Sequence, residues 1–122
     1  MILNDNLYTT DRIDRDAATC SITLNPEHPI YKAHFPEKPI TPGVCVIQIA
    51  KELFENLSGS SLTLAEVVNA KFLSVINPLE TKSLDYEFSK IMQTDDDGVK
   101  LTAIAKDSDT VYAKLSLKFK KS

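Results

Sequence analysis

The stretch from His34 to Gln48 reads HFPEKPITPGVCVIQ and contains the side chains whose types and spacing could carry out chemistry. His34 offers an imidazole, which can take up a proton near neutral pH. Gly43 opens an apolar run that reads as the start of a helix, where backbone N–H groups lack intrahelical partners. Such groups can stabilise negative charge on a carbonyl oxygen while a nearby base removes a proton.

The loop between these two groups is stiffened by proline. Because each proline fixes its own φ angle, the loop would present His34 to the helix start with little conformational entropy left to lose. Gly43 would let a substrate approach the backbone closely. A loop histidine satisfied by backbone groups is the alternative for His34 taken alone. His28 lies between two prolines without such a context, and we interpret it as a plain loop residue.

A helix must position these groups, and the apolar pattern of residues 43–57 predicts such a helix. Thr41 can serve as its N-cap, Pro42 suits the first helical position, and Ser58-Gly59 should end it. Apolar side chains occupy most of the helix circumference, which indicates a buried helix. They fall on two sides: Val44, Ile47, Ala50, Phe54 and Leu57 on one, and Val46, Ile49 and Leu53 on the other.

Strand patterns account for most of the remaining chain. The candidates are residues 22–24, 62–73, 84–88, 99–106 and 111–119, and the last alternates most cleanly between apolar and polar side chains. The acidic tip Asp95–Gly98 predicts a hairpin, with a solvated turn favoured over a metal site. A short strand, one helix and then four strands joined by short turns predict an α+β fold, in which an antiparallel sheet wraps around the helix.

The composition is that of an ordinary globular chain. Its 122 residues predict a single domain over 1–122, and a net charge of −3 does not indicate a nucleic-acid partner. No apolar run approaches the ~20 residues of a membrane span, and the N-terminus is too polar for a secretory signal. Cys20 and Cys45 do not suggest a disulfide framework. We therefore expect a cytoplasmic protein.

The motif and the order of elements resemble the hotdog fold of the FabZ/FabA-type 3-hydroxyacyl-[acyl-carrier-protein] dehydratases. That family has His-Phe-Pro, two residues, Pro, two residues, and Pro-Gly-Val, and this chain matches the pattern from His34 to Val44. A looser match runs from Lys71-Phe72 to Glu80. There only Pro78 of the family's Val-x-Pro-Gly-Asp turn is kept, with Leu79 in place of the glycine.

The resemblance implies a lyase that removes water from 3-hydroxyacyl thioesters on acyl carrier protein, giving trans-2-enoyl thioesters in fatty-acid or related acyl-chain synthesis. It implies that His34 is the base and that Gly43 with the helix start holds the thioester carbonyl. It also implies substrate contacts from Phe35, Val44, Ile47 and Phe72. We expect no metal and no cofactor. Because family protomers pair their sheets around an acyl tunnel, we expect a homodimer or a hexamer made of three such dimers, with Val46 and Phe54 as further tunnel residues.

Gln48 departs from the family pattern. The family has its acid, a Glu or Asp, at this position, and a neutral amide cannot protonate a leaving hydroxyl. The family usually has a Gln four residues later, where this chain has Glu52. The amide and the carboxylate have thus exchanged places. Since positions four apart share a helix face, Glu52 could share a pocket with Gln48.

Two hypotheses follow for this pair of candidate catalytic residues. In the first, Glu52 takes over the acid role. In the second, Gln48 only forms hydrogen bonds, and Glu52 points to solvent near Lys51 and Glu55.

The function also has alternatives, because a fold alone does not choose between chemistries. One is a hotdog thioester hydrolase, and the other is a non-catalytic acyl-binding subunit that pairs with a catalytic homologue. Lysines near the motif regions would suit an acidic carrier protein: Lys32, Lys38 and Lys71.

Overall fold

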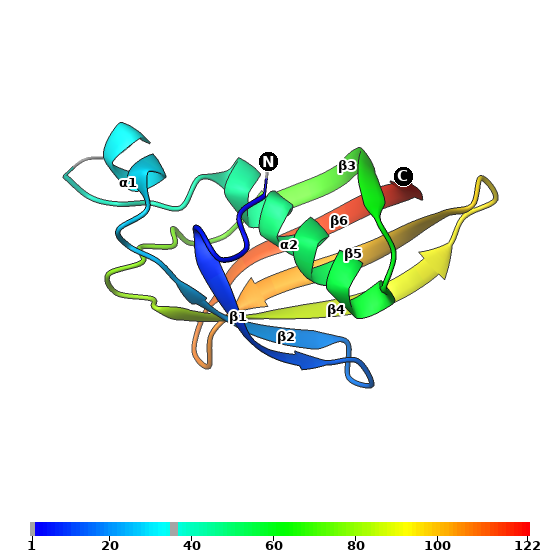
Figure 1. Cartoon of the computed structure of the whole chain (residues 1–122), viewed down its shortest axis with the longest axis horizontal. Helices are drawn as coiled ribbons and strands as arrows, with labels where there is room; N and C mark the ends of the chain where they lie inside the picture. Colours follow the sequence, from blue (N-terminus) through cyan, green and yellow to red (C-terminus); the bar gives the residue numbers. More distant parts are fainter. Residues whose placement is uncertain (1, 35–36) are drawn as a thin grey trace.

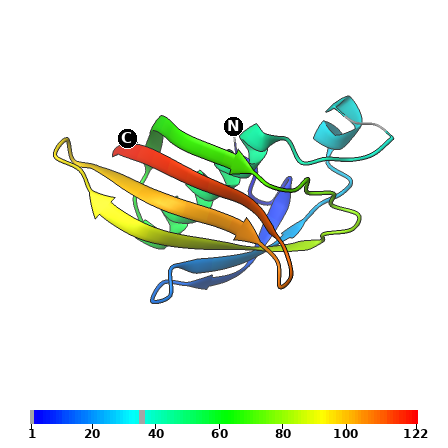
Figure 2. The ribbon, with the colours of Figure 1, turned by 180° about the vertical axis from the view of Figure 1, so that it is seen from behind.

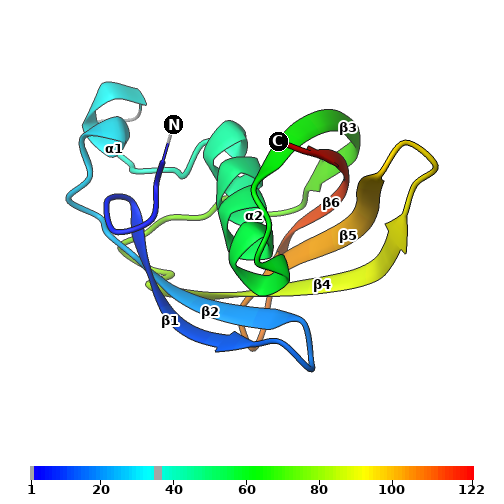
Figure 3. The ribbon, with the colours of Figure 1, turned by 45° about the vertical axis from the view of Figure 1, so that its right-hand side comes forward.

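A six-stranded antiparallel sheet curves around one long helix in the computed structural model, which describes residues 2–34 and 37–122 and, of His34, the backbone only. The helix, α2 (Gly43–Ser58), lies in the concave side of the sheet (Figures 1 and 3). The strands are β1 (Tyr8–Asp14), β2 (Thr19–Leu24), β3 (Leu62–Phe72), β4 (Ser83–Gln93), β5 (Gly98–Lys106) and β6 (Val111–Lys121). This arrangement confirms the predicted hotdog fold.

The strand order in the sheet is β1-β2-β4-β5-β6-β3. The prediction of four successive strands joined by short turns holds for β4, β5 and β6, but it is wrong for β3, which pairs with β6 at the edge of the sheet. Seen from behind in Figure 2, β3 and β6 lie side by side along one edge. The connection from β3 to β4, residues 73–82, therefore carries the chain from that edge to the middle of the sheet, where β4 lies between β2 and β5.

The ends of α2 only partly follow the sequence prediction. The helix ends as predicted, with Gly59 in the left-handed region at φ 70° and its N–H donating to the Glu55 carbonyl at 2.9 Å. At the other end the predicted N-cap is wrong. Pro42 occupies the N-cap position without a side-chain hydrogen bond, and Thr41 instead bonds its hydroxyl to the Tyr31 hydroxyl at 2.9 Å.

The core lies between α2 and the inner face of the sheet. The helix contributes Cys45, Val46, Ile49, Ala50, Leu53 and Phe54, and the alternating strands contribute Leu84, Tyr86, Phe88, Ala113, Leu115, Leu117 and Phe119. One flank of the helix stays open, because Val44 is 64% exposed. The prediction that α2 is buried around most of its circumference is therefore wrong at that flank.

Two elements were not predicted. The strand β1 has a polar sequence, YTTDRID, at the edge of the sheet, and only Tyr8 of its seven residues is fully buried, so it lacks a clear apolar alternation. The helix α1 (Pro29–His34) has only six residues, too few to show a period. It begins beside His28, whose Nδ1 accepts the N–H of Ile30 at 3.1 Å.

The acidic tip forms the predicted hairpin between β4 and β5. The N–H of Thr94 donates to the Gly98 carbonyl at 3.0 Å, and a Cβ on Gly98 would lie 2.5 Å from the Phe119 carbonyl oxygen. The carboxylates of Asp96 and Asp97 pair with Lys118 and Lys121 at 3.2 and 3.6 Å. Within the described ranges, no group of three His, Cys, Asp or Glu side chains could hold a metal ion, and no helix is long and apolar enough to cross a membrane.

Replacing Leu53 with alanine should destabilise the fold by about 3 kcal/mol, because the side chain is 1% exposed and its loss leaves a cavity between α2 and the sheet. Leu79→Ala is the matched control, since Leu79 is 59% exposed. Urea unfolding followed by circular dichroism would measure both. Equal losses for the two variants would contradict the location of the core described above.

Candidate functional site

A pocket of about 760 Å³ opens at the N-terminal end of α2. Residues 40–43 and residues 72–76 form its two sides, and Val46 contributes from the next turn of the helix. The pocket thus lies where the proline-rich segment enters α2 and where the chain leaves β3. It has the mixed apolar and polar lining that is typical of small-molecule sites.

Hydrogen bonds hold the two sides of the pocket together. The N–H of Thr41 donates to the Ile76 carbonyl at 2.8 Å, and the buried Thr41 hydroxyl binds Tyr31 of α1. On the other side, the N–H groups of Leu73 and Ser74 reach the Tyr112 carbonyl at 2.8 and 3.3 Å. The segment after β3 is therefore held by β6, and the segment before α2 is held by the segment after β3.

The start of α2 is suited to hold a negative oxygen. The first N–H groups of a helix have no intrahelical acceptor, and none of the side chains that the structure describes caps this helix. Its first turn also contains no acidic residue. Partial positive charge from the helix dipole therefore faces the pocket without a carboxylate to neutralise it.

Phe72 covers Gly43 at the pocket wall. A Cβ built on Gly43 would lie 2.9 Å from the Phe72 Cζ, closer than carbon atoms approach without strain. The Phe72 side chain is half exposed, at 50%. The glycine therefore lets an aromatic ring lie against the first turn of the helix, and that ring forms part of the pocket wall.

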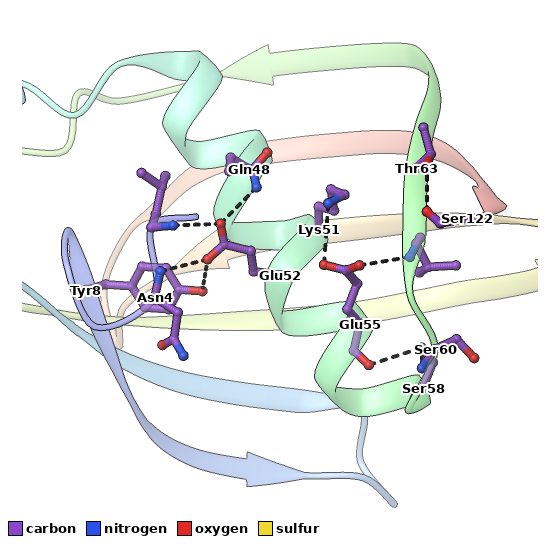
Figure 4. Close-up of polar contacts among 12 residues, drawn as sticks. Asn4, Tyr8, Gln48, Lys51, Glu52, Glu55, Ser58, Ser60, Thr63 and Ser122 are labelled. Carbon is purple, nitrogen blue, oxygen red and sulfur yellow. Dashed lines mark hydrogen bonds and ion pairs between the residues drawn. The ribbon is translucent and has the colours of Figure 1, made fainter. Parts of the chain in front are cut away.

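Glu52 lies one turn after Gln48 and binds the N-terminal segment (Figure 4). Its Oε2 accepts hydrogen bonds from the N–H of Leu3 and from Gln48 Nε2, both at 2.8 Å. Its Oε1 accepts hydrogen bonds from the N–H of Asn4 at 2.8 Å and from the Tyr8 hydroxyl at 2.9 Å. Of the two hypotheses for this pair, the placement of Glu52 in solvent is therefore wrong. To act as an acid, Glu52 would have to be protonated and would have to give up hydrogen bonds from these donors.

The Tyr8 hydroxyl stays protonated in this arrangement. Burial raises its pKa well above the usual value for tyrosine, and the negative charge and hydrogen bond of Glu52 raise it further. The group therefore acts as a permanent donor to Glu52 near neutral pH.

Glu55 makes a similar link on the neighbouring flank of α2. Its Oε2 accepts the N–H of Leu62 at 2.8 Å, and its Oε1 lies 3.4 Å from Lys51 Nζ. Lys51 and Glu55 thus pair with each other, and neither of them binds Glu52 in the bonds described.

The structure brings only some of the predicted site residues together. Gly43 and Phe72 line the pocket, while Val44 is exposed and Ile47 is half-buried on the open flank of α2. Phe35 and the His34 ring lie outside the described residues, and the backbone of His34 ends α1. Their roles stay predictions.

Sequence reasoning missed the part played by the N-terminus. Leu3, Leu7 and Tyr8 are all buried, yet they occur in a stretch that reads as polar. Their spacing was the available signal, because isolated apolar residues in a polar segment can mark contacts with a core.

Comparisons with known proteins agree on one family. The sequence pattern of the ApeI-like family, described as ApeI dehydratase, matches residues 10–119. The 3-hydroxyacyl-[acyl-carrier-protein] dehydratase FabZ of Fusobacterium nucleatum is 31% identical over 104 residues, covering 81% of this chain and 70% of that protein. FabZ of Clostridium tetani is 27% identical over 126 residues, covering 98% and 85%.

Solved structures share the fold. The dehydratase heterocomplex ApeI:P from Xenorhabdus doucetiae superposes with a TM-score of 0.63 at 17% identity, covering 93% of this chain and 95% of that chain. A sigma28-regulated virulence protein from Campylobacter jejuni superposes with a TM-score of 0.70 at 10% identity, covering 98% and 88%. At these identities the structures show the fold alone.

Gly43→Ala should displace the Phe72 ring and narrow the pocket, because the new methyl group would lie 2.9 Å from that ring. We expect stability to change by less than about 1 kcal/mol, since the ring can move into solvent and alanine favours the helix. Affinity for an acyl thioester should fall. Isothermal titration would measure this fall, and the same change in a Phe72→Ala background should cost little. An equal loss in both backgrounds would contradict the proposed contact.

Proposed function

The chain belongs to the ApeI-like dehydratase family, and from this premise we propose that it removes water from a 3-hydroxyacyl thioester to give a trans-2-enoyl thioester. The pocket at the start of α2 is the observation that carries the proposal. A thioester carbonyl lodged there would face the uncapped N–H groups of Gly43 and Val44. Charge that develops on its oxygen would then be stabilised by these groups and by the helix dipole.

We assign proton removal to His34. The imidazole would take the proton from C2 of the acyl chain, and the electron pair would move toward the thioester oxygen at the helix start. As the C2–C3 double bond forms, the C3–O bond breaks and the hydroxyl leaves with a proton. Gln48 cannot supply that proton, so the imidazolium formed in the first step is the donor we propose. Gln48 would orient the 3-hydroxyl group.

The acyl chain would contact the apolar surface around the pocket. Phe72 forms part of the pocket wall, and Val44 and Ile47 extend the apolar surface along the open flank of α2. Phe35 belongs to the same proposal through its place in the motif. These side chains would exclude water from the reacting carbons.

We propose acyl carrier protein as the bearer of the thioester. The FabZ relatives carry this substrate in their names. Lys32, Lys38 and Lys71 are exposed, and Lys71 directly precedes the Phe72 of the pocket wall. Positive charge at the mouth of the pocket would attract an acidic carrier protein.

A second copy of the chain would cover the edge of the sheet. Strand β3 is an edge strand, and apolar side chains are exposed along it and just beyond it: Val67, Val68, Phe72, Leu73 and Val75. An apolar edge of this kind invites strand pairing with another chain. Because the pocket lies at the end of β3, a homodimer formed at this edge would enclose the pocket.

One further candidate function has an observation in its favour. The amide of Gln48 replaces the acid of the family, and Glu52 is engaged by the N-terminal segment. A non-catalytic subunit that binds acyl chains and pairs with a catalytic homologue would have no need of an acid. The ApeI:P dehydratase of Xenorhabdus doucetiae is itself a heterocomplex. A thioester hydrolase would need Glu52 aimed at the carbonyl, and its hydrogen bonds direct it elsewhere.

Incubation with 3-hydroxyacyl carrier protein, followed by mass spectrometry, tests the reaction directly. Loss of water supports the dehydratase, release of the free carrier thiol supports the hydrolase, and binding without either supports the subunit. His34→Ala should lower kcat by about 10²–10⁴-fold, the usual contribution of a positioned base. His28→Asn is the matched control, because asparagine can still accept the Ile30 N–H and the rate should hold. An unchanged rate in His34→Ala would remove His34 as the base.

Val68→Lys should weaken the proposed dimer, because it places a charge on the apolar edge at a side chain that is 42% exposed. Met92→Lys, at 61% exposed on β4, is the control and should leave the assembly intact. Light scattering over a range of concentrations would give the mass of each variant. A monomeric wild type, or a dimer indifferent to Val68→Lys, would contradict pairing at this edge.

A further inference from the structure

A cluster that we call the N-terminal clasp joins the start of the chain to α2. It consists of Leu3, Asn4, Tyr8, Gln48 and Glu52 (Figure 4). Among the described residues, four donors converge on the Glu52 carboxylate, two on each oxygen. A carboxylate has about four acceptor positions and no proton to donate, so it matches this set of donors.

A neutral side chain could not replace Glu52 in this cluster. The N–H groups of Leu3 and Asn4 are consecutive, and they bind the two different oxygens of the carboxylate at 2.8 Å each. A glutamine would present an NH₂ group to one of these donors, so two donors would face each other. Hydrogen bonds from N–H groups to a charged acceptor are also stronger than those to a neutral one.

Apolar packing holds the donors of the clasp in place. Leu3 and Leu7 are 3% and 0% exposed, and the N–H of Leu7 donates to the Leu3 carbonyl at 2.8 Å. Tyr8 is 1% exposed and begins β1. The N-terminal turn is therefore a packed part of the core that delivers fixed donors to the side of α2.

We propose that Glu52 is a positioning residue that, together with the N-terminal turn, fixes the orientation of the Gln48 amide. Because the carboxylate only accepts hydrogen bonds, the Gln48 Nε2 must face it, at 2.8 Å, and the amide oxygen must face away. Position 48 would then offer an oriented carbonyl oxygen in place of an acid. The inference deepens the proposed function, and its importance for turnover rests on that function.

The clasp also explains the exchanged order of amide and carboxylate. The N-terminal donors require a carboxylate at position 52. A second carboxylate at position 48 would lie one helical turn away, at hydrogen-bond distance from the first, and like charges four residues apart destabilise a helix. An amide that donates to Glu52 removes this repulsion. A glutamine at position 48 is therefore the partner that the clasp selects.

The hydrogen bond can be tested first in the wild-type protein, without any variant. We expect a through-hydrogen-bond scalar coupling between Gln48 Nε2 and Glu52 Cδ in NMR spectra, with slowed hydrogen exchange of the Gln48 NH₂ group. In Glu52→Gln one neutral carbonyl oxygen remains for the four donors, so the coupling should weaken and the Gln48 NH₂ signals should move toward free-amide positions. Glu55→Gln is the matched control, because Glu55 lies on the same helix and binds Leu62 and Lys51 instead. A wild-type Gln48 NH₂ group with free-amide shifts and fast exchange would overturn the inference.

Measurements of kcat and KM test the role of Glu52 in turnover. Glu52→Gln should lower kcat by about ten-fold or more while KM changes by less than about two-fold, because binding by the pocket is retained and the orientation of Gln48 is lost. Glu55→Gln should stay within about two-fold of the wild type in both parameters. A moved Gln48 signal with an unchanged kcat would overturn the positioning role. Absence of turnover in the wild type would count against the proposed function alone, and the NMR result would then decide this inference.

The electrostatic reason for the exchange has its own test. Gln48→Glu should lower the midpoint of thermal unfolding at pH 8, because it sets two carboxylates against each other. The double variant Gln48→Glu/Glu52→Gln should recover part of this loss, although it also weakens the bonds to Leu3 and Asn4. A single variant as stable as the wild type would overturn the argument for a selected amide.

Discussion

Burial of one side of α2 against the concave face of the sheet is the interaction on which the rest of the structure depends. Six helix side chains are buried there, and each contributes roughly 1–3 kcal/mol through loss of contact with water. This contact sets where the first turn of the helix lies. The segments before α2 and after β3 then meet at that turn through Thr41 and Ile76, and the pocket is the space that they enclose.

The outer flank of the same helix binds backbone N–H groups of two other segments. Glu52 binds the N-terminal turn, and Glu55 binds the first residue of β3. Both carboxylates accept N–H groups that would otherwise need water or another acceptor. The helix therefore positions its neighbours through charged side chains on one flank and through apolar side chains on the other. Gln48 lies between the charged flank and the apolar flank, because it contacts Glu52 and precedes the buried Ile49.

The sequence predicted the helix, its C-terminal end, the hairpin at Asp95–Gly98 and the alternating strand β6, because each has a strong local signal. It did not predict β1 or α1, since an edge strand with polar side chains and a six-residue helix show no clear period. The sequence also did not predict the pairing of β3 with β6, because strand order depends on contacts between distant segments. Gly43 and Phe72 were placed at the site by the motif, and the pocket includes both. The spacing of four residues placed Gln48 beside Glu52, but the two backbone donors to Glu52 had no local signal, because Leu3 and Asn4 are far away in the sequence.

The place of β3 in the sheet has a consequence for how the chain folds. In the described part of the chain β3 pairs only with β6, and β4 and β5 lie between these strands in the sequence. Strand pairs that close such long loops form late, and chains rich in them fold slowly. During synthesis, β3 would leave the ribosome well before its partner. Its apolar residues would then be exposed to other nascent chains for that interval, during which a chaperone could protect them.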